Sequence, residues 1–141
     1  MSPLVVRFSM NEITDVLLIE DSTTQALQLR LLLQRVGYHV RIATDGAEGW
    51  RLACSINPRL ILLDVNLPLL DGFQVLTRLK RGRNTAPIPI VMLTSRDSVS
   101  DVERAIALGA DDYLFKDDCL STRGEPALLY TAVDQVLRPK N

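Results

Sequence analysis

The chain has 141 residues and a formal net charge of −1, with 16 Lys and Arg against 17 Asp and Glu. This length predicts one domain with a normal core, and the near-neutral charge argues against direct binding to nucleic acid or to an anionic membrane surface. Residues 1–13 lack the charged start and long apolar stretch of a signal peptide, and no apolar run approaches a membrane span in length. We expect a cytoplasmic protein in which residues 1–13 form a loosely held extension.

Cysteine and histidine are too sparse for a metal site built on these residues. Cys54 and Cys119 lie far apart without metal-ligand spacing, which predicts two free thiols in a reducing compartment. The single histidine, His39, excludes a zinc site that needs two histidines. Alternating residues in the segment 38–43 place His39 on the solvent face of an edge strand. The basic segment 78–83 falls where a helix should end, a position that favours cations through the helix dipole.

Five short apolar segments alternate with amphipathic segments along the chain. The apolar segments predict strands over residues 15–20, 38–43, 59–64, 89–94 and 112–116. The first helix is expected to begin near residues 22–24 and to end at Gly37. The second starts with a capping box, Asp45 with Glu48. Its buried face is predicted to contain the residues Ala47, Trp50 and Cys54.

Three more helices are predicted in the second half of the chain. One opens at Asp71, interpreted as a helix cap and not as a ligand, and buries Phe73, Leu76 and Leu79. The next has a capping box of Ser100 with Glu103 and ends at Gly109. The last takes Pro126 in its first turn and extends to about residue 138. Strict alternation of strands and helices predicts an α/β fold, a (βα)₅ doubly wound parallel sheet covered on both faces.

Polar residues end four of the predicted strands. Open parallel sheets bind ligands beyond the carboxyl ends of their strands, so these side chains are expected to share one rim. The residues are Glu20 and Asp21, Asp64, Thr94 with Ser95, and Lys116. Clustered carboxylates repel unless a cation joins them, and oxygen ligands without histidine suit Mg²⁺. The rim therefore predicts a site for phosphoryl chemistry with Mg²⁺ as cofactor.

The segments LLIEDS, LLDVNLPLLDG, VMLTS and GADDYLFK, in this order, resemble the CheY-like receiver domain of two-component response regulators. The resemblance covers residues 14–138, leaving 139–141 as a C-terminal tail, and implies a flavodoxin-like five-stranded sheet with strand order 2-1-3-4-5. It also implies a role for each matching residue. Asp64 would be the phosphoacceptor, Glu20 and Asp21 would hold Mg²⁺ with Asp64 and the Asn66 backbone carbonyl, Thr94 and Lys116 would bind the phosphoryl oxygens, and Tyr113 would be the aromatic switch.

The same resemblance implies the partners. A sensor histidine kinase or a phosphotransfer protein would donate the phosphoryl group, because a site without histidine is the recipient and not the kinase. The output would be contact with a downstream protein, or self-dimerisation, through the helix near residues 100–108, the strand 112–116 and the helix 126–138. The domain would be a signalling switch that catalyses only its own phosphorylation and dephosphorylation.

Two other functions stay open at this point. A haloacid-dehalogenase-type phosphatase also uses Asp, Thr or Ser, and Lys at strand ends, but it needs a second aspartate where this chain has Asn66. A pseudo-receiver that takes no phosphate is favoured by one departure, because Asp117 follows Lys116 where the family usually has proline. Without proline a cis bond costs about 2.5–4 kcal/mol, so we predict a trans bond, a Lys116 that still reaches Asp64, and an unusual and mobile loop over residues 117–125.

Overall fold

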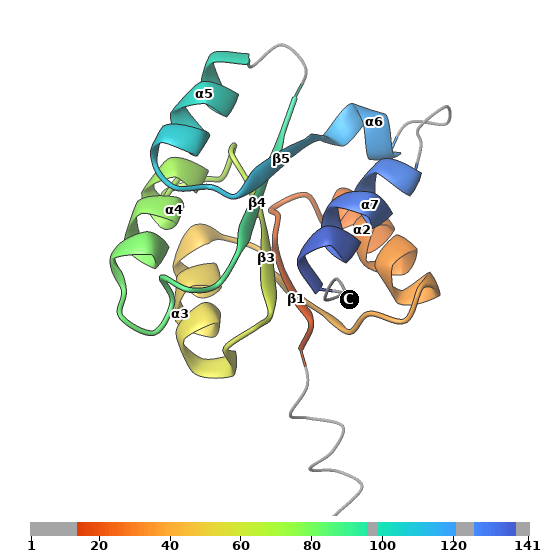
Figure 1. Cartoon of the computed structure of the whole chain (residues 1–141), viewed down its shortest axis with the longest axis horizontal. Coiled ribbons are helices and arrows are strands. Elements are labelled where there is room, and N and C mark those ends of the chain that lie inside the picture. The colour runs from red at the N-terminus through yellow and green to blue at the C-terminus, as the bar shows by residue number, and fades with distance from the viewer. Residues whose placement is uncertain (1–13, 96–98, 121–125, 138–141) are drawn as a thin grey trace, which may run out of the picture.

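The computed structural model describes residues 14–95, 99–120 and 126–137. Five parallel strands form one sheet in the order β2-β1-β3-β4-β5, and helices cover both of its faces (Figure 1). The predicted fold and strand order are confirmed. The strands are β1 (Val16–Ile19), β2 (Val40–Ala43), β3 (Leu60–Asp64), β4 (Ile90–Thr94) and β5 (Asp112–Phe115). The helices are α2 (Thr23–Arg35), α3 (Gly46–Ile56), α4 (Gly72–Arg81), α5 (Val99–Ala107), α6 (Lys116–Leu120) and α7 (Pro126–Leu137).

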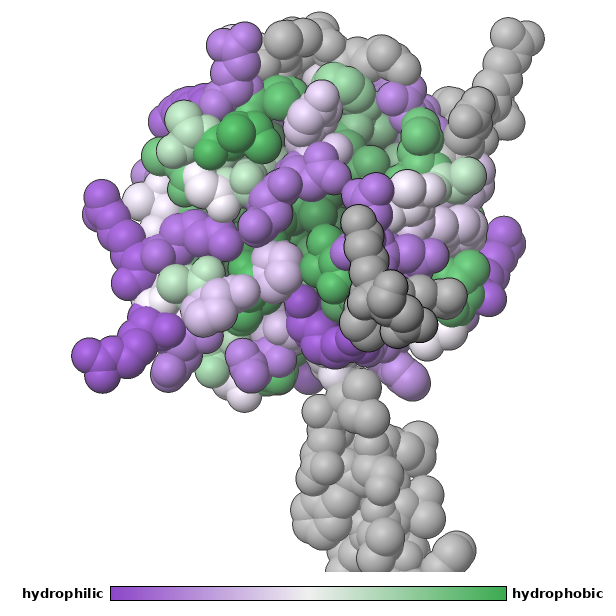
Figure 2. All heavy atoms as spheres, in the orientation of Figure 1, coloured by the Kyte–Doolittle hydropathy of each residue, from purple (hydrophilic) through white to green (hydrophobic). Residues whose placement is uncertain are grey.

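The central strands are apolar along their whole length because both faces of the sheet are covered. Side chains of β1 alternate between two cores: Leu17 and Ile19 face one, and Val16 and Leu18 face the other. The first core is closed by α3, α4 and α5, and the second by α2, α6 and α7, on the two sides of the sheet in Figure 1. On the face seen in Figure 2, hydrophobic residues reach the surface in separate patches between hydrophilic ones.

The buried face of α3 differs from the predicted one. Ala47 and Cys54 are exposed and Trp50 keeps 38% of its surface, so the prediction was wrong. The buried residues are Gly46, Gly49, Leu52 and Ala53. The physical reason is close packing at Gly49, where an added Cβ would lie 2.5 Å from Cδ1 of Ile19. The helix approaches the sheet through Gly49, a residue that a search for large apolar side chains overlooks.

Neither of the two predicted capping boxes, at α3 and at α5, is formed. The side chain of Asp45 accepts from the Glu48 amide at 2.8 Å, as predicted, but the Glu48 carboxylate accepts from the amide of Thr44 and so completes no capping box with Asp45. Ser100 is the second residue of α5 and therefore does not cap it, which corrects that prediction. The residue before Val99 lies outside the described part of the chain.

Other features of the fold match the predictions. Asp71 caps α4 in a capping box with Gln74, Gly37 and Gly109 follow helices with positive φ angles of 95° and 107°, and both cysteines are free. His39 is exposed beside the edge strand β2. Within residues 14–95, 99–120 and 126–137, no helix has the length and apolar character needed to cross a membrane.

Arg59 connects the start of β1 with the end of α7. Its guanidinium donates to the Asp15 carboxylate at 3.1 Å and to the backbone carbonyl of Leu137 at 2.7 Å. The Asp15 carboxylate also accepts from the backbone amide of His39 at 2.7 Å. Burial acts to raise the pKa of Asp15, but these hydrogen bonds outweigh it and leave the pKa lowered. The amino ends of the strands are thus fixed by a hydrogen-bonded carboxylate.

Candidate functional site

The candidate functional residues lie at the carboxyl ends of the strands. The register of β1 against β3 places two of them, Glu20 and Asp64, side by side. Ile19 of β1 pairs with Leu63 of β3, so the next residues, Glu20 and Asp64, end neighbouring strands side by side. Glu20 is fully buried and Asp64 is 1% exposed. Two carboxylates are therefore withdrawn from water at the same edge of the sheet, which requires compensating charge.

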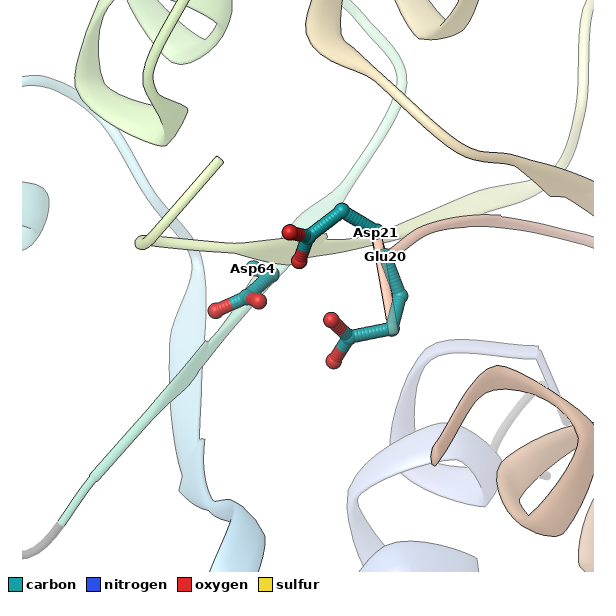
Figure 3. Close-up of side chains that lie close together, drawn as sticks. All are labelled: Glu20, Asp21 and Asp64. Carbon is teal, nitrogen blue, oxygen red and sulfur yellow. The ribbon is translucent and has the colours of Figure 1, made fainter. Parts of the chain in front are cut away.

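Asp21 joins these two carboxylates from the exposed side. One carboxylate oxygen from each of Glu20, Asp21 and Asp64 lies within 4.8 Å of the others, and the side chains of Glu20 and Asp21 extend from the end of β1 toward Asp64 (Figure 3). Burial and the neighbouring Asp64 raise the pKa of Glu20, against the opposing effect of Lys116. A cluster of this kind, made of oxygen donors without histidine, fits a hard divalent cation such as Mg²⁺.

Lys116 supplies one compensating positive charge. Its ammonium donates to Asp64 Oδ2 at 3.2 Å, to Glu20 Oε1 at 3.0 Å and to Gln25 Oε1 at 2.9 Å. Burial acts to lower the pKa of Lys116, but the carboxylates of Asp64 and Glu20 outweigh it and raise the pKa. The lysine is therefore charged at neutral pH and lies beside the buried carboxylate of Asp64.

The backbone after Lys116 follows the prediction only in part. The described residues contain no cis peptide bond, so the Lys116–Asp117 bond is trans as expected, and the contact with Asp64 is retained. However, Lys116 is the first residue of the short helix α6, which runs to Leu120. The predicted loop is thus wrong for residues 117–120, where buried Cys119 anchors the segment in the core shared with α2 and α7. Residues 121–125, which complete the predicted loop, lie outside the described residues.

The remaining predicted residues surround this cluster. Thr94 ends β4 and is 1% exposed, and its hydroxyl donates to the Ser95 carbonyl at 3.4 Å, a long contact. The backbone amide of Asn66 donates to Asp64 Oδ1 at 3.1 Å. Tyr113 lies on the edge strand β5, is 38% exposed, and packs edge-on against Phe115 with ring centroids 5.5 Å apart. The switching roles of Thr94 and Tyr113 and the Asn66 carbonyl as ligand stay predictions.

The sequence analysis missed Gln25 and Ser22. Ser22 caps α2 and accepts from the Gln25 amide at 3.3 Å, and the Ser22 amide donates to Glu20 Oε2 at 3.2 Å. Gln25 was overlooked because glutamine is unremarkable in an amphipathic helix. Its position in the first turn after an acidic strand end was the one available signal, because such a turn faces the carboxyl edge of the sheet.

A family model for the response regulator receiver domain matches residues 16–121, which include every residue of the site described above. The chain belongs to this family. The receiver domain is also similar to a regulator from Synechocystis sp., the DNA-binding dual master transcriptional regulator RpaA, with 42% identity over 101 residues. That alignment covers 72% of this chain and 42% of the relative. The receiver domain spans less than half the length of the relatives that are 40–43% identical to it.

Solved structures give the same assignment. A putative response regulator from Chloroflexus aurantiacus superposes on the receiver domain with a TM-score of 0.78 and 32% identity, covering 89% of this chain and 99% of that one. The receiver domain of a sensor histidine kinase from Pseudomonas aeruginosa superposes with a TM-score of 0.77 and 26% identity, covering 90% and 99%. That structure contains a magnesium ion coordinated in its active-site cleft. This chain is thus a receiver domain of two-component response regulators, a family of signalling switches.

Proposed function

We propose that Asp64 accepts a phosphoryl group from a phosphohistidine of a sensor histidine kinase or a phosphotransfer protein. The observation that supports this most directly is the placement of the Asp64 carboxylate, which is buried at the end of β3 and lies 3.2 Å from the Lys116 ammonium. A carboxylate oxygen of Asp64 would attack phosphorus, the bond from phosphorus to the imidazole nitrogen would break, and the imidazole would leave.

The other residues of the rim would position and neutralise the transferred group. Lys116 would pair with a phosphoryl oxygen, and the Thr94 hydroxyl would turn from its long contact with Ser95 to donate a hydrogen bond to another phosphoryl oxygen. Glu20, Asp21 and Asp64, with the Asn66 carbonyl, would hold Mg²⁺. Bound there, Mg²⁺ would supply positive charge that stabilises the phosphoryl oxygens during transfer. The charge balance supports a cation at this position. The cluster holds three carboxylates but only one ammonium, so it retains excess negative charge that Mg²⁺ would neutralise.

The consequence of phosphorylation would be a changed protein-interaction surface. We place it on α5, β5 and α7, around Tyr113, because Thr94 ends β4 and Tyr113 lies on the adjacent strand β5, two residues before the partner of Thr94. The downstream partner would be another protein or a second copy of the chain. We propose residues 14–138 as the switching domain, residues 1–13 as an extension and residues 139–141 as a tail. A cytoplasmic location remains a prediction.

The proposal is tested by intact-mass spectrometry after incubation with acetyl phosphate. The wild-type chain should gain one phosphoryl group in the presence of Mg²⁺ and none after chelation, and Asp64→Asn should gain none. A mass gain that persists in Asp64→Asn, or that is indifferent to the chelator, would contradict the assignment. Turnover of a small phosphate ester would instead favour a phosphatase, which we do not expect with Asn66 at the position of the general acid.

A pseudo-receiver is the second candidate, favoured by the replacement of the usual proline by Asp117 and by the helix α6 that follows. Amide hydrogen exchange separates the two functions. Beryllofluoride, a phosphoryl mimic, should change exchange within residues 94–116 if the domain is a phosphorylation switch. Unchanged exchange across that segment would indicate a pseudo-receiver.

A further inference from the structure

Lys116 belongs to a closed ring of hydrogen bonds that includes the first turn of α2. The ammonium donates to Glu20 Oε1 and to Gln25 Oε1, at 3.0 Å and 2.9 Å. The other oxygen of Glu20 accepts from the Ser22 amide, and Ser22 Oγ accepts from the Gln25 amide, at 3.2 Å and 3.3 Å. The start of α2 is therefore tied to the same carboxylate that Lys116 contacts.

Gln25 differs from the two other acceptors of Lys116 in charge and in location. Glu20 and Asp64 belong to the carboxylate cluster, so their oxygens are also needed for the metal and for the transferred group. Gln25 lies on α2, carries no charge and is not part of that cluster. It can keep its hydrogen bond to the ammonium while the carboxylates are engaged elsewhere, and it does not cancel the positive charge of Lys116.

An additional acceptor matters for this lysine because its side chain is long and flexible. A lysine side chain loses rotamer entropy when it is fixed in one orientation. Lys116 is the first residue of α6 and directly follows the last residue of β5. With Gln25 in place, each of the three N–H groups of the ammonium has an acceptor, which favours one orientation beside Asp64.

We propose that Gln25 is a positioning residue for Lys116 and, through it, sets the rate at which Asp64 gains and loses its phosphoryl group. The inference rests on the proposed function and deepens it. Lys116 would contribute to transfer only while it is held in the productive orientation, because preorganised charge lowers the barrier without reorganisation during the reaction.

The test compares Gln25→Leu with Gln28→Leu in the full chain. Gln28 is an exposed glutamine on the same helix and is the matched control. Phosphorylation by acetyl phosphate at saturating Mg²⁺ should be about tenfold slower in Gln25→Leu, as expected for loss of one hydrogen bond to a charged group, and unchanged in Gln28→Leu. The Mg²⁺ concentration for half-maximal rate should be unchanged in Gln25→Leu and raised in Asp21→Asn, which separates positioning of the lysine from metal binding.

A second readout needs no phosphorylation. In proton–nitrogen NMR the ammonium resonance of Lys116, assigned by its disappearance in Lys116→Arg, should be protected from solvent exchange in the wild type and in Gln28→Leu and should broaden in Gln25→Leu. An unchanged resonance, or equal phosphorylation rates in Gln25→Leu and the control, would refute the positioning role alone. A wild-type chain that takes no phosphoryl group would instead overturn the proposed function and, with it, the claim about rate.

Discussion

Gly72 opens α4 against the backbone that carries the proposed phosphoacceptor. A Cβ added there would lie 2.3 Å from the carbonyl oxygen of Asp64 and 2.7 Å from Cα of Val65. These are backbone atoms at the end of the central strand β3, so they cannot move aside as a side chain would. We predict that Gly72→Ala displaces the first turn of α4 and destabilises the protein.

The structure sets the size of this effect. Overpacking of a buried contact costs about 1–3 kcal/mol, and displacement of the helix also strains the hydrogen bond from the Gly72 amide to the Val65 carbonyl, at 3.0 Å. A hydrogen bond of this type contributes about 1 kcal/mol, and the better helix propensity of alanine returns at most about 1 kcal/mol. The net loss should be about 1–3 kcal/mol, which lowers Tm by about 3–12 °C for a domain of this size.

Urea unfolding and thermal unfolding measure the loss, with Gly37→Ala as the control. Gly37 has no atom within 4 Å of an added Cβ, but its φ of 95° disfavours alanine, so this variant should lose stability through backbone strain far from the site. Gly72→Ala should also slow phosphorylation of Asp64, whereas Gly37→Ala should not. A Gly72→Ala protein as stable as the wild type would refute the packing argument.

Three further predictions concern other parts of the chain. Leu69 is fully exposed with a φ of 66°, so Leu69→Gly should raise the free energy of unfolding by about 1 kcal/mol through relief of left-handed strain; a loss of stability would reveal a contact made by the leucine. Burial acts to raise the pKa of Asp15, but the hydrogen bonds led by the His39 amide outweigh it and leave the pKa lowered in the folded protein. The stabilisation from Asp15 is therefore fully present above its unfolded pKa of about 3.9 and is lost as the pH falls through the lower folded pKa. The stability gap between wild type and Asp15→Asn, from denaturant unfolding, should therefore shrink between pH 6 and pH 3, and a constant gap would contradict this. Burial raises the pKa of the Cys119 thiol to about 11, so a thiol reagent should modify exposed Cys54 first, and equal rates in a folded protein would exclude the buried placement.

The fold could be predicted because its central strands follow simple rules. The continuous apolar runs at residues 16–19, 60–63 and 90–93 indicate strands buried on both faces, and the polar residues that follow them mark one edge of the sheet. Asp64 and Lys116, far apart in the chain, could be placed together because parallel strands bring their carboxyl ends to one edge. The role of each residue is what the family motifs imply, and it stays a prediction.

The errors arise where a contact between elements decides the outcome. The face that α3 buries depends on the space above Ile19, which only a glycine at position 49 leaves open, and hydrophobic periodicity favours Trp50 instead. The helix α6 depends on a place in the core for Cys119, between α2 and α7. Gln25 contacts a side chain 91 residues away, so its position in the first turn after an acidic strand end is the one reason that local sequence gives to select it.

The link made by Arg59 brings the two ends of the described chain together. Asp15, just before β1, and Leu137, at the end of α7, share this one guanidinium. They lie at the amino edge of the sheet, because Asp15 precedes β1, whereas Asp64 is the last residue of β3 at the opposite edge. Closely spaced ends are the condition under which circular permutation is tolerated. A linker joining the ends of the described chain, with new ends opened at the exposed residues 83 and 84 between α4 and β4, at the amino edge of the sheet and away from the acidic rim, should therefore preserve the fold. The order in which the strands are synthesised could then be changed without moving the carboxylates relative to Lys116.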